Sequence, residues 1–368
     1  FRQIGYKTPG HPEYGHTVGV EATTGPLGHG FAMGVGMALA ETVLAQTYNT
    51  PEFKIIDNYT YAIVSDGDLM EGVSYEAASF AGTMQLGKLI YIYDDNKITI
   101  EGTTELTFTE NVRARFEACN WQVLNVADSE DNDALLAAIA QAQQEQSKPS
   151  LIIVRTHIGY NSPRQDSASA HGEPLGAENV LKTKEKLGLG TEEFYVPQAV
   201  RAYFDERIQA YSAHETAWQQ VFTAYQAQYP QKAAELMQRL QGEMTPPTIE
   251  DLTKLFADGK DRATRDASGE VLQVLSKNFS PLLGGSADLG PSNKTVIKNG
   301  GDYNAADRLG KNIHFGIREH AVGTICNGLA LYGGIVPYGA TFLVFADFMR
   351  PAVRMAALMG LHAVFVFT

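Results

Sequence analysis

The sequence predicts an α/β fold with two doubly wound domains, each built on a mainly parallel sheet, joined by a helical linker. Short apolar runs alternate with helical patterns in two stretches of the chain, which is typical of βα units. Between these stretches lies a segment with helical patterns alone, and 368 residues are enough for two ordinary domains. We therefore expect a first domain at 1–190, a linker at 191–250 and a second domain at 251–368.

The first domain is expected to alternate strands and helices after a glycine-rich beginning. Apolar runs bounded by turn residues predict four strands, at 59–65, 88–94, 121–126 and 150–155. Apolar and small residues at helical spacing predict helices at 30–48, 72–84 and 132–145. In such a domain, side chains that follow the strands point into the crevice where α/β sheets bind ligands.

The linker and the second domain are separated by a break in pattern. Residues 196–242 are rich in Gln, Ala, Tyr and Glu at helical period, which predicts a pair of helices, and Pro246-Pro247 ends the stretch. The second α/β pattern predicts strands at 281–285, 313–315, 335–338 and 363–367. Its predicted helices are at 264–278, 319–331 and 345–359.

Composition and charge exclude several classes of partner. The chain has 29 Lys and Arg against 42 Asp and Glu, a net charge of −13, so no nucleic-acid partner is expected. No run approaches the ~18 apolar residues that a membrane span needs, and no signal peptide is visible. The two cysteines, Cys119 and Cys326, have no metal-ligand spacing and are expected to be reduced thiols. We therefore expect a cytoplasmic protein without a membrane partner.

Two polar clusters follow neighbouring predicted strands of the first domain. Ser65-Asp66-Gly67-Asp68 stands where a strand ends and a helix begins, and Asn96 with Ile98 follows the next strand. A carboxylate, an amide oxygen and a backbone carbonyl suit a hard divalent cation that also holds a diphosphate. Gly67 would let the backbone approach a phosphate at a helix N-terminus. An Asp-Gly-Asp sequence alone is more often a turn, so the interpretation depends on the combined spacing.

Glycine-rich and histidine-containing loops form a second group of candidates. Segments 8–13 and 24–30 contain His11, Gly25 and Leu27, and their glycines allow a loop to lie against a ligand. Ile158 and His171 follow the last predicted strand of the first domain, and an exposed histidine there can act as an acid or base. A glycine-rich turn or a loop histidine is by itself weak support for a site.

The second domain supplies a glutamate and a row of aromatics. Glu319, in Gly-Ile-Arg-Glu-His, would keep its proton more readily if apolar neighbours shield it, although it also fits the opening of a helix. Phe342, Phe345 and Phe348 have a spacing that is more often typical of a core than of a cofactor pocket.

In this order, these segments resemble the transketolase family of thiamine diphosphate enzymes, and both domains would then be of the thiamine diphosphate-binding type. The family's diphosphate motif, usually Gly-Asp-Gly with a distal Asn, has Ser65 here in place of its first glycine. The resemblance implies that Asp66, Asn96 and the Ile98 carbonyl hold the cation, Mg²⁺ or alternatively Ca²⁺ or Mn²⁺. It implies that Asp66, Gly67 and Asn96 also bind the diphosphate.

The resemblance extends to the loops that would surround the thiazolium ring. It implies that Gly25 and Leu27 line this ring and that Ile158 packs on it. His11 would meet the terminal hydroxyl of a sugar, and His171 would reach both the diphosphate and the substrate hydroxyl that loses a proton. Family members usually carry Gln where this chain has His29, to which we assign no role.

In the second domain, the resemblance makes Glu319 the carboxylic acid that activates the aminopyrimidine ring. Phe342, Phe345 and Phe348 match the aminopyrimidine pocket, although the third is often Tyr elsewhere. The resemblance also implies contacts of three further residues with cofactor and substrate. Arg265 and Ser292 would bind the sugar phosphate and Asp288 would lie near the cofactor.

The resemblance also covers acidic residues between sites and the ends of the chain. Glu71 and Glu76 match residues that link paired cofactor sites across the family's dimer, although a solvated helix face is nearly as good an interpretation. The motifs run through the whole chain, yet the family has further segments before and after it, so we expect a chain truncated at both ends.

The expected function is transketolase activity: reversible transfer of a two-carbon ketol unit from a ketose phosphate to an aldose phosphate on thiamine diphosphate. Glu319, His171 and His11 are the expected catalytic residues, in a homodimer with active sites at the subunit interface, and the fragment by itself need not be active. One alternative is another ketol- or acyl-transferring thiamine enzyme, such as a deoxyxylulose phosphate synthase, against which the His-Pro-Glu and Ser-Ala-Asp-Leu segments argue. Another is a non-catalytic binding or assembly fragment. A dinucleotide-binding protein ranks last, because the Gly-x-Gly-x-x-Gly turn is missing after the first strand.

Overall fold

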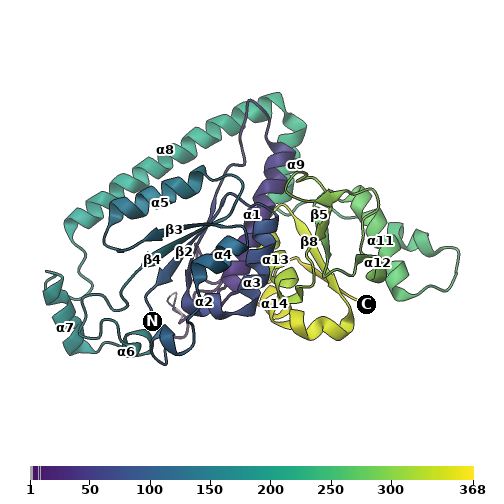
Figure 1. Cartoon of the computed structure of the whole chain (residues 1–368). Helices are drawn as coiled ribbons and strands as arrows, with labels where there is room; N and C mark the ends of the chain where they lie inside the picture. The colour runs from purple at the N-terminus through teal and green to yellow at the C-terminus, as the bar shows by residue number, and fades with distance from the viewer. Residues whose placement is uncertain (1–2, 7, 9) are drawn as a thin grey trace.

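The computed structural model describes residues 3–6, 8 and 10–368, in which two parallel sheets are surrounded by helices (Figure 1). Pro9, in the predicted glycine-rich segment 8–13, lies outside the described residues. The predicted α/β class with mainly parallel sheets is confirmed, since the strand pairs described in both sheets are parallel. Among the described helices, none is both long and apolar enough to cross a membrane.

The first sheet has the strand order β1-β2-β4-β3. Its strands lie within one residue of the predicted bounds: β1 Thr60–Ser65, β2 Leu89–Asp95, β3 Gln122–Val126 and β4 Ser150–Arg155. Ser65 pairs with Asp94, and Asp94 with Val154, so the carboxyl ends of three strands meet at one edge. Helix α5 (Asn132–Gln144) packs on one face, whereas α1 (His29–Tyr48) and α3 (Gly72–Thr83) cover the other.

Several shorter helices complete the first domain. None of them was among the helices predicted at 30–48, 72–84 and 132–145, because segments of three to ten residues show too few turns for a clear period, and the His171 segment had been interpreted as a loop. The shorter helices are α2 Asp66–Met70, η1 Thr104–Leu106, α4 Val112–Ala118, α6 Ala168–Gly172 and α7 Ala177–Lys186.

The second sheet has the order β6-β7-β5-β8-β9. Four of its strands were predicted, whereas β6 has only two residues and no apolar run that would indicate it. The strands are β5 Leu282–Ser286, β6 Asp302–Tyr303, β7 Asn312–His314, β8 Val336–Thr341 and β9 Val364–Phe367. Its helices are α10 Ile249–Thr253, η2 Lys254–Phe256, α11 Thr264–Asn278, α12 Gly290–Asn293, α13 Glu319–Tyr332, η3 Leu343–Phe345 and α14 Ala346–Met359.

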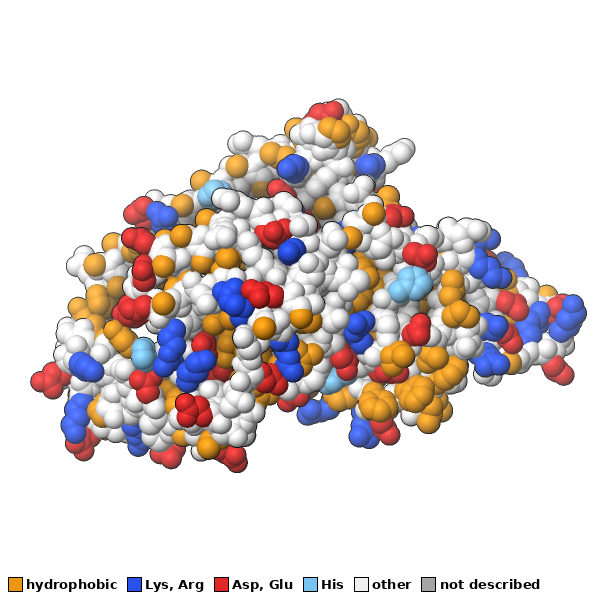
Figure 2. Space-filling view, viewed as in Figure 1, with side chains coloured by type: hydrophobic (Ala, Val, Ile, Leu, Met, Phe, Trp, Pro, Cys, Tyr) orange, Lys and Arg blue, Asp and Glu red, His pale blue; other side chains and the backbone are white. Residues whose placement is uncertain are grey.

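An apolar surface lies at the carboxyl end of the second sheet. Leu343, Val344 and Phe348, on η3 and α14, are between 64% and 75% exposed. Figure 2 shows orange side chains gathered over this part of the molecule, on the lower right of the view. Large apolar side chains gathered in this way are typical of a surface that meets another protein segment.

The two sheets share one apolar core because α1 packs against α13. Buried residues of both helices, together with both sheets, form a single continuous cluster. The helices cross where each has a glycine. A Cβ on Gly36 would lie 2.2 Å from the carbonyl oxygen of Ile325, and one on Gly328 would lie 2.0 Å from that of Met33. Only glycine allows the two backbones to approach this closely.

Replacing Gly328 by alanine is therefore expected to lower the denaturant midpoint of the chain, by about 2–3 kcal/mol of unfolding free energy. The methyl group would push against the backbone of α1, and this outweighs the ~1 kcal/mol by which alanine favours a helix. Gly72→Ala is the matched control, since a Cβ there has nothing within 4 Å. Equal stability of the two variants would contradict this account of the helix crossing.

The predicted pair of linker helices is present as α8 (Gln198–Gln228) and α9 (Pro230–Leu240). In Figure 1, α8 runs along the outside of the first domain and α9 lies beside the upper end of α1. The Tyr225 hydroxyl donates to the Tyr48 carbonyl at 2.8 Å, and the Trp218 indole donates to the Ile55 carbonyl at 3.0 Å. These bonds fasten the linker to the end of α1.

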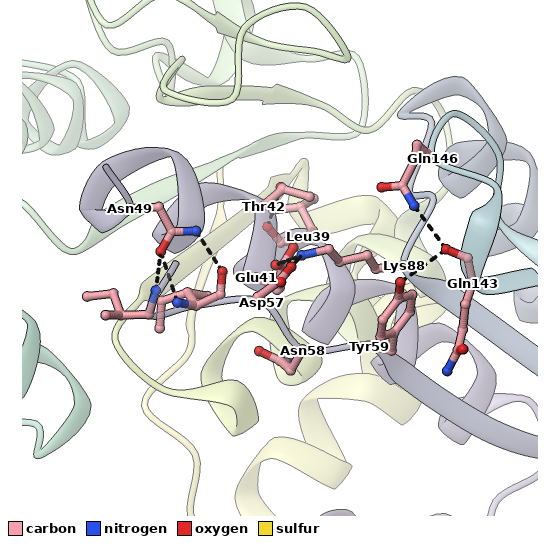
Figure 3. Close-up of polar contacts among 12 residues, drawn as sticks. Leu39, Glu41, Thr42, Asn49, Asp57, Asn58, Tyr59, Lys88, Gln143 and Gln146 are labelled. Carbon is pink, nitrogen blue, oxygen red and sulfur yellow. Dashed lines mark hydrogen bonds and ion pairs between the residues drawn. The ribbon is translucent and has the colours of Figure 1, made fainter. Parts of the chain in front are cut away.

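Polar contacts hold the segment between α1 and β1 (Figure 3). The Lys88 ammonium donates to both Glu41 and Asp57 at 2.6 Å, which ties α1 to the start of β2. The Asn49 side chain caps the turn after α1, because its amide donates to the Ile56 carbonyl and its oxygen accepts from the Ile56 N–H. The helix that carries the glycine-rich loop is thus fixed at its far end.

Candidate active site

The predicted diphosphate motif begins with a helix cap at the carboxyl end of β1. Ser65 precedes α2, its hydroxyl accepts from the Asp68 N–H at 3.4 Å, and the Asp68 carboxylate accepts from the Ser65 N–H at 2.9 Å. This capping box satisfies backbone groups at the first turn of α2. It gives a physical reason for serine where the family motif usually has glycine, and it fixes the orientation of the next residue, Asp66.

Asp66 and Asn96 are both buried at this edge of the sheet. Asp66 is 3% exposed and accepts a hydrogen bond from the Tyr93 hydroxyl, and the Asn96 side-chain oxygen accepts from the Ile98 N–H at 2.8 Å. Burial raises the pKa of Asp66, the bond from Tyr93 opposes this, and the carboxylate of Asp95 raises the pKa further. A cation at this place would offset the cost of an ionised, buried carboxylate.

The residues present fit a divalent cation that depends on a second ligand. A carboxylate, an amide oxygen and a backbone carbonyl are hard oxygen donors, yet they are too few for a complete shell. Among the described residues, no cluster of three or more His, Cys, Asp and Glu side chains has an arrangement able to hold a metal ion. A cation at Asp66 and Asn96 would therefore need oxygens from a bound group such as a diphosphate.

A glycine cradle lies next to Asp66. A Cβ on Gly67 would meet the Leu27 side chain at 2.8 Å, so Leu27 rests against the bare backbone of this glycine. The Gly28 N–H donates to the Asp68 carboxylate at 3.0 Å, and Gly28 has a positive φ of 76° that favours glycine. The structure thus brings together two segments that the sequence analysis had assigned to the same cofactor.

His11 lies against Gly25, in the loop that carries Leu27. A Cβ on Gly25 would lie 3.3 Å from the His11 ring, while His11, Gly25 and Leu27 are all exposed. His11 and Gly25, from the two predicted glycine-rich segments, therefore lie side by side. Their exposed side chains are free to contact a ligand.

A cavity of about 690 Å³ opens at the carboxyl ends of the same strands. Its lining includes Asn96, Ile158 and His171, together with Asp94 and Thr156. Ile158 is half-buried, whereas His171 lies on α6 and is exposed. Three residues predicted to act on one cofactor thus line one cavity, at the edge where Asp66 also lies.

The predicted catalytic glutamate begins a helix of the second domain. Glu319 is the first residue of α13, is half-buried, and accepts a hydrogen bond from the Thr341 hydroxyl at 3.2 Å. Glu76 of α3 accepts from the Ala321 N–H at 2.9 Å, and burial raises its pKa. Glu76 is therefore not part of a solvated face, whereas Glu71 is exposed.

The three predicted pocket phenylalanines lie just before η3, at its end and on α14. Phe342 and Phe345 are half-buried and Phe348 is exposed, with the rings of Phe345 and Phe348 centred 6.4 Å apart. They are thus not the core residues that their spacing also allowed. All three rings are therefore at least partly accessible to a ligand.

The predicted sugar-phosphate residues lie apart from Asp66, on the second domain. Arg265 is exposed in the first turn of α11, and Ser292 is exposed on α12. Their chain neighbours Asp266 and Pro291 line one cavity of about 610 Å³. Asp288 is exposed after β5 with a positive φ of 60°. The structure therefore brings Arg265 and Ser292 to one region, although it does not assign them a ligand.

Sequence reasoning missed a histidine pair beside Glu319. The Nε2 atoms of His29 and His320 lie 3.0 Å apart, with the two rings edge to face. Burial, and then the charges of His320 and Arg354, lower the pKa of His29 to about 4, and burial also lowers the pKa of His320. The departure from glutamine at position 29 was the one available signal.

This pair predicts that the chain loses stability in mild acid. Because the folded pKa of His29 lies below its ordinary value of 6.5, the unfolded chain binds more protons, and stability falls as pH drops through 6.5 towards 4. We expect a loss of about 2 kcal/mol between pH 7 and pH 5. His29→Gln should remove that part of the slope in denaturant unfolding, whereas His214→Gln, at an exposed position on α8, should not. Equal slopes for the two variants would contradict the assignment.

Comparison with known protein families matches two families, one after the other along the chain. Residues 1–245 match the family described as "Transketolase, thiamine diphosphate binding domain". Residues 260–368 match "Transketolase, pyrimidine binding domain". The fold and the site therefore define a thiamine diphosphate-binding α/β protein. Within that class, the chain belongs to the transketolase family.

Individual relatives are similar over the whole chain. Transketolase of Bacillus subtilis is 50% identical over 371 residues, covering 100% of this chain and 56% of its own length. Transketolase of Aquifex aeolicus is 50% identical, with 53% of its length covered. A Pichia stipitis transketolase mutant structure described in complex with xylulose-5-phosphate has a TM-score of 0.94 at 42% identity, over 99% of this chain and 55% of that one. The chain thus spans about half the length of these relatives.

Proposed function

We propose that this chain forms the cofactor-binding part of a transketolase, which transfers a two-carbon ketol unit from a ketose phosphate to an aldose phosphate. The observation that carries the proposal is the edge of the first sheet. There, buried Asp66 and Asn96 adjoin the Gly67–Leu27 cradle and a cavity lined by Ile158 and His171. Thiamine diphosphate, when bound, would supply a carbanion-stabilising carbon, and the protein supplies binding, orientation and proton transfer.

For the cofactor, we propose that Asp66, Asn96 and the Ile98 carbonyl hold a divalent cation, Mg²⁺ or alternatively Ca²⁺ or Mn²⁺. Buried oxygens of this kind match hard cations, and the diphosphate would complete the shell. Leu27 and Ile158 would hold the thiazolium ring by apolar contact. The remaining cofactor-binding residues of the proposal are Gly25, Gly67, His171, Asp288, Glu319, Phe342, Phe345 and Phe348.

For the substrate, we propose His11 and His171 as residues that bind its hydroxyl groups, with His171 accepting the proton that is lost. Both are exposed at the cradle and the cavity, where an imidazole can exchange a proton with a ligand. Arg265 and Ser292 would bind the phosphate. The Pichia stipitis structures described with xylulose-5-phosphate and sedoheptulose-7-phosphate support sugar phosphates as substrates.

We propose that the working protein is a cytoplasmic homodimer whose active sites lie at the subunit interface. In this chain, the pocket phenylalanines lie open and Leu343, Val344 and Phe348 expose large apolar surfaces (Figure 2). A second subunit that brings its Asp66 edge to this surface would bury them. We also propose domain boundaries near 190 and 250, because α8 and α9 lie between the two sheets along the chain.

The test is to incubate the chain with thiamine diphosphate, Mg²⁺ and xylulose-5-phosphate, and to follow both donor cleavage and growth of an aldose phosphate by two carbons. Ketol transfer is expected, and it should be lost in His171→Ala. The second candidate, a non-catalytic binding fragment, rests on the exposed apolar surface at η3 and α14. It would be favoured by a chain that binds the cofactor yet never cleaves the donor.

A further inference from the structure

The contact between His29 and His320 joins the two domains beside the proposed site. His29 is 2% exposed, is the first residue of α1, and directly follows the loop that carries Leu27 and Gly28. His320 is the second residue of α13, next to Glu319. The ring centroids are 4.9 Å apart and the Nε2 atoms 3.0 Å apart. Such a buried contact between two polar rings needs a defined arrangement of protons.

The pair works as a hydrogen bond only when one Nε2 carries a proton and the other is bare. Two protonated rings would face each other with two donors and two charges, in a place from which water is excluded. His29 Nδ1 is also buried and has no hydrogen-bond partner among the described residues. The Nε2 contact is therefore the interaction that orients the His29 ring.

The first turn of α13 is held from the first domain at three points around Glu319. His29 contacts His320, the Glu76 carboxylate accepts from the Ala321 N–H, and the Ser79 hydroxyl accepts from the Arg318 guanidinium at 3.0 Å. The latter two contacts come from α3. The His29 contact leads directly to the glycine cradle, because His29 follows Gly28, whose N–H is bonded to Asp68.

We propose that His29 is a positioning residue, which sets the orientation of Glu319 by fixing the first turn of α13 against the cofactor-binding loop. The inference rests on the proposed function, in which Glu319 acts on the cofactor. A displacement of about 1 Å in a reacting group can cost about 10²-fold in rate, so the register of this turn matters. No step of the reaction passes through His29 itself.

The first test needs no cofactor. Hydrogen exchange of the amides of residues 321–323 is compared in the wild-type chain, His29→Leu and His29→Gln. Leucine removes the bond, so exchange in this turn is expected to rise about tenfold or more, whereas glutamine can replace the bond and should stay within about twofold. His214→Leu, at an exposed position on α8, is the control. Unchanged exchange in His29→Leu would overturn the proposal, and so would an equal rise throughout α11 and α14.

The second test separates this inference from the proposed function. With thiamine diphosphate and Mg²⁺ bound, the rate at which the proton on the thiazolium carbon exchanges with solvent is measured by NMR. We expect about a tenfold decrease in His29→Leu with cofactor affinity unchanged, and no more than about a twofold decrease in His29→Gln. If Glu319→Gln lowers the rate and His29→Leu does not, the inference about His29 alone fails. If Glu319→Gln has no effect, the proposed function itself fails.

Discussion

Replacing Glu319 by glutamine is expected to slow proton exchange at the thiazolium carbon by about 10²–10⁴-fold, the usual contribution of a positioned acid or base. Glu319 is the first residue of α13, and its carboxyl accepts a hydrogen bond from the Thr341 hydroxyl. The glutamine amide can still accept that bond, so the local structure should persist. It cannot share a proton with the aminopyrimidine ring, however, and the ring's amino group would not become a base.

The measurement is isotope exchange at the cofactor carbon, combined with titration of thiamine diphosphate in the presence of Mg²⁺. Cofactor affinity should change by no more than about threefold, since one hydrogen bond contributes little net free energy. Glu178→Gln is the matched control, because it makes the same chemical change at an exposed position of α7, where Glu178 pairs with Lys182. An exchange rate in Glu319→Gln equal to that of the control would contradict the proposed role of Glu319 in activating the cofactor.

The second large effect is expected at Asp66. Asp66→Ala should raise the dissociation constant of thiamine diphosphate in the presence of Mg²⁺ by about 100-fold or more, because even partners of metal ligands commonly cost 10–100-fold. Asp66 is the one buried carboxylate of the proposed cation site. Without it, the negative charges of the diphosphate and of the neighbouring carboxylates would have no cation between them.

Stability distinguishes a lost ligand from a damaged fold. Burial raises the pKa of Asp66 in the cofactor-free chain, so an ionised carboxylate there costs free energy. Removing that cost offsets the loss of the bond from the Tyr93 hydroxyl, and the melting temperature should change little. Asp133→Ala, at an exposed position in the first turn of α5, is the control for loss of an acidic residue. If Asp66→Ala binds the cofactor as the wild type does, the cation site lies elsewhere.

The sequence was sufficient to predict the sheets and the edge at which Asp66 and Asn96 lie. Apolar runs mark the long strands, and parallel strands place their carboxyl ends together, so residues that follow neighbouring strands must lie close. Strand β6 was not predicted, because its two residues contain no apolar run. Its pairing with β7 is what defines it as a strand. Helix α4 was not predicted because its seven residues are too few to show a helical period.

Contacts between distant segments were the part that the sequence could not predict. Gly36 and Gly328 look like ordinary small residues in helices until the crossing of α1 and α13 shows backbone atoms where their Cβ atoms would be. His29 and His320 are 291 positions apart, and each taken alone fits a satisfied core histidine. Such pairs depend on how the two domains pack against each other, and local sequence patterns do not show this packing.

The most direct test of the central claim is titration calorimetry of thiamine diphosphate into the chain, with and without Mg²⁺. The account predicts binding that requires the cation, because the oxygens near Asp66 and Asn96 are too few to hold a diphosphate without it. Binding of equal strength without a divalent cation would contradict the proposed site at the edge of the first sheet. So would the absence of binding in both conditions.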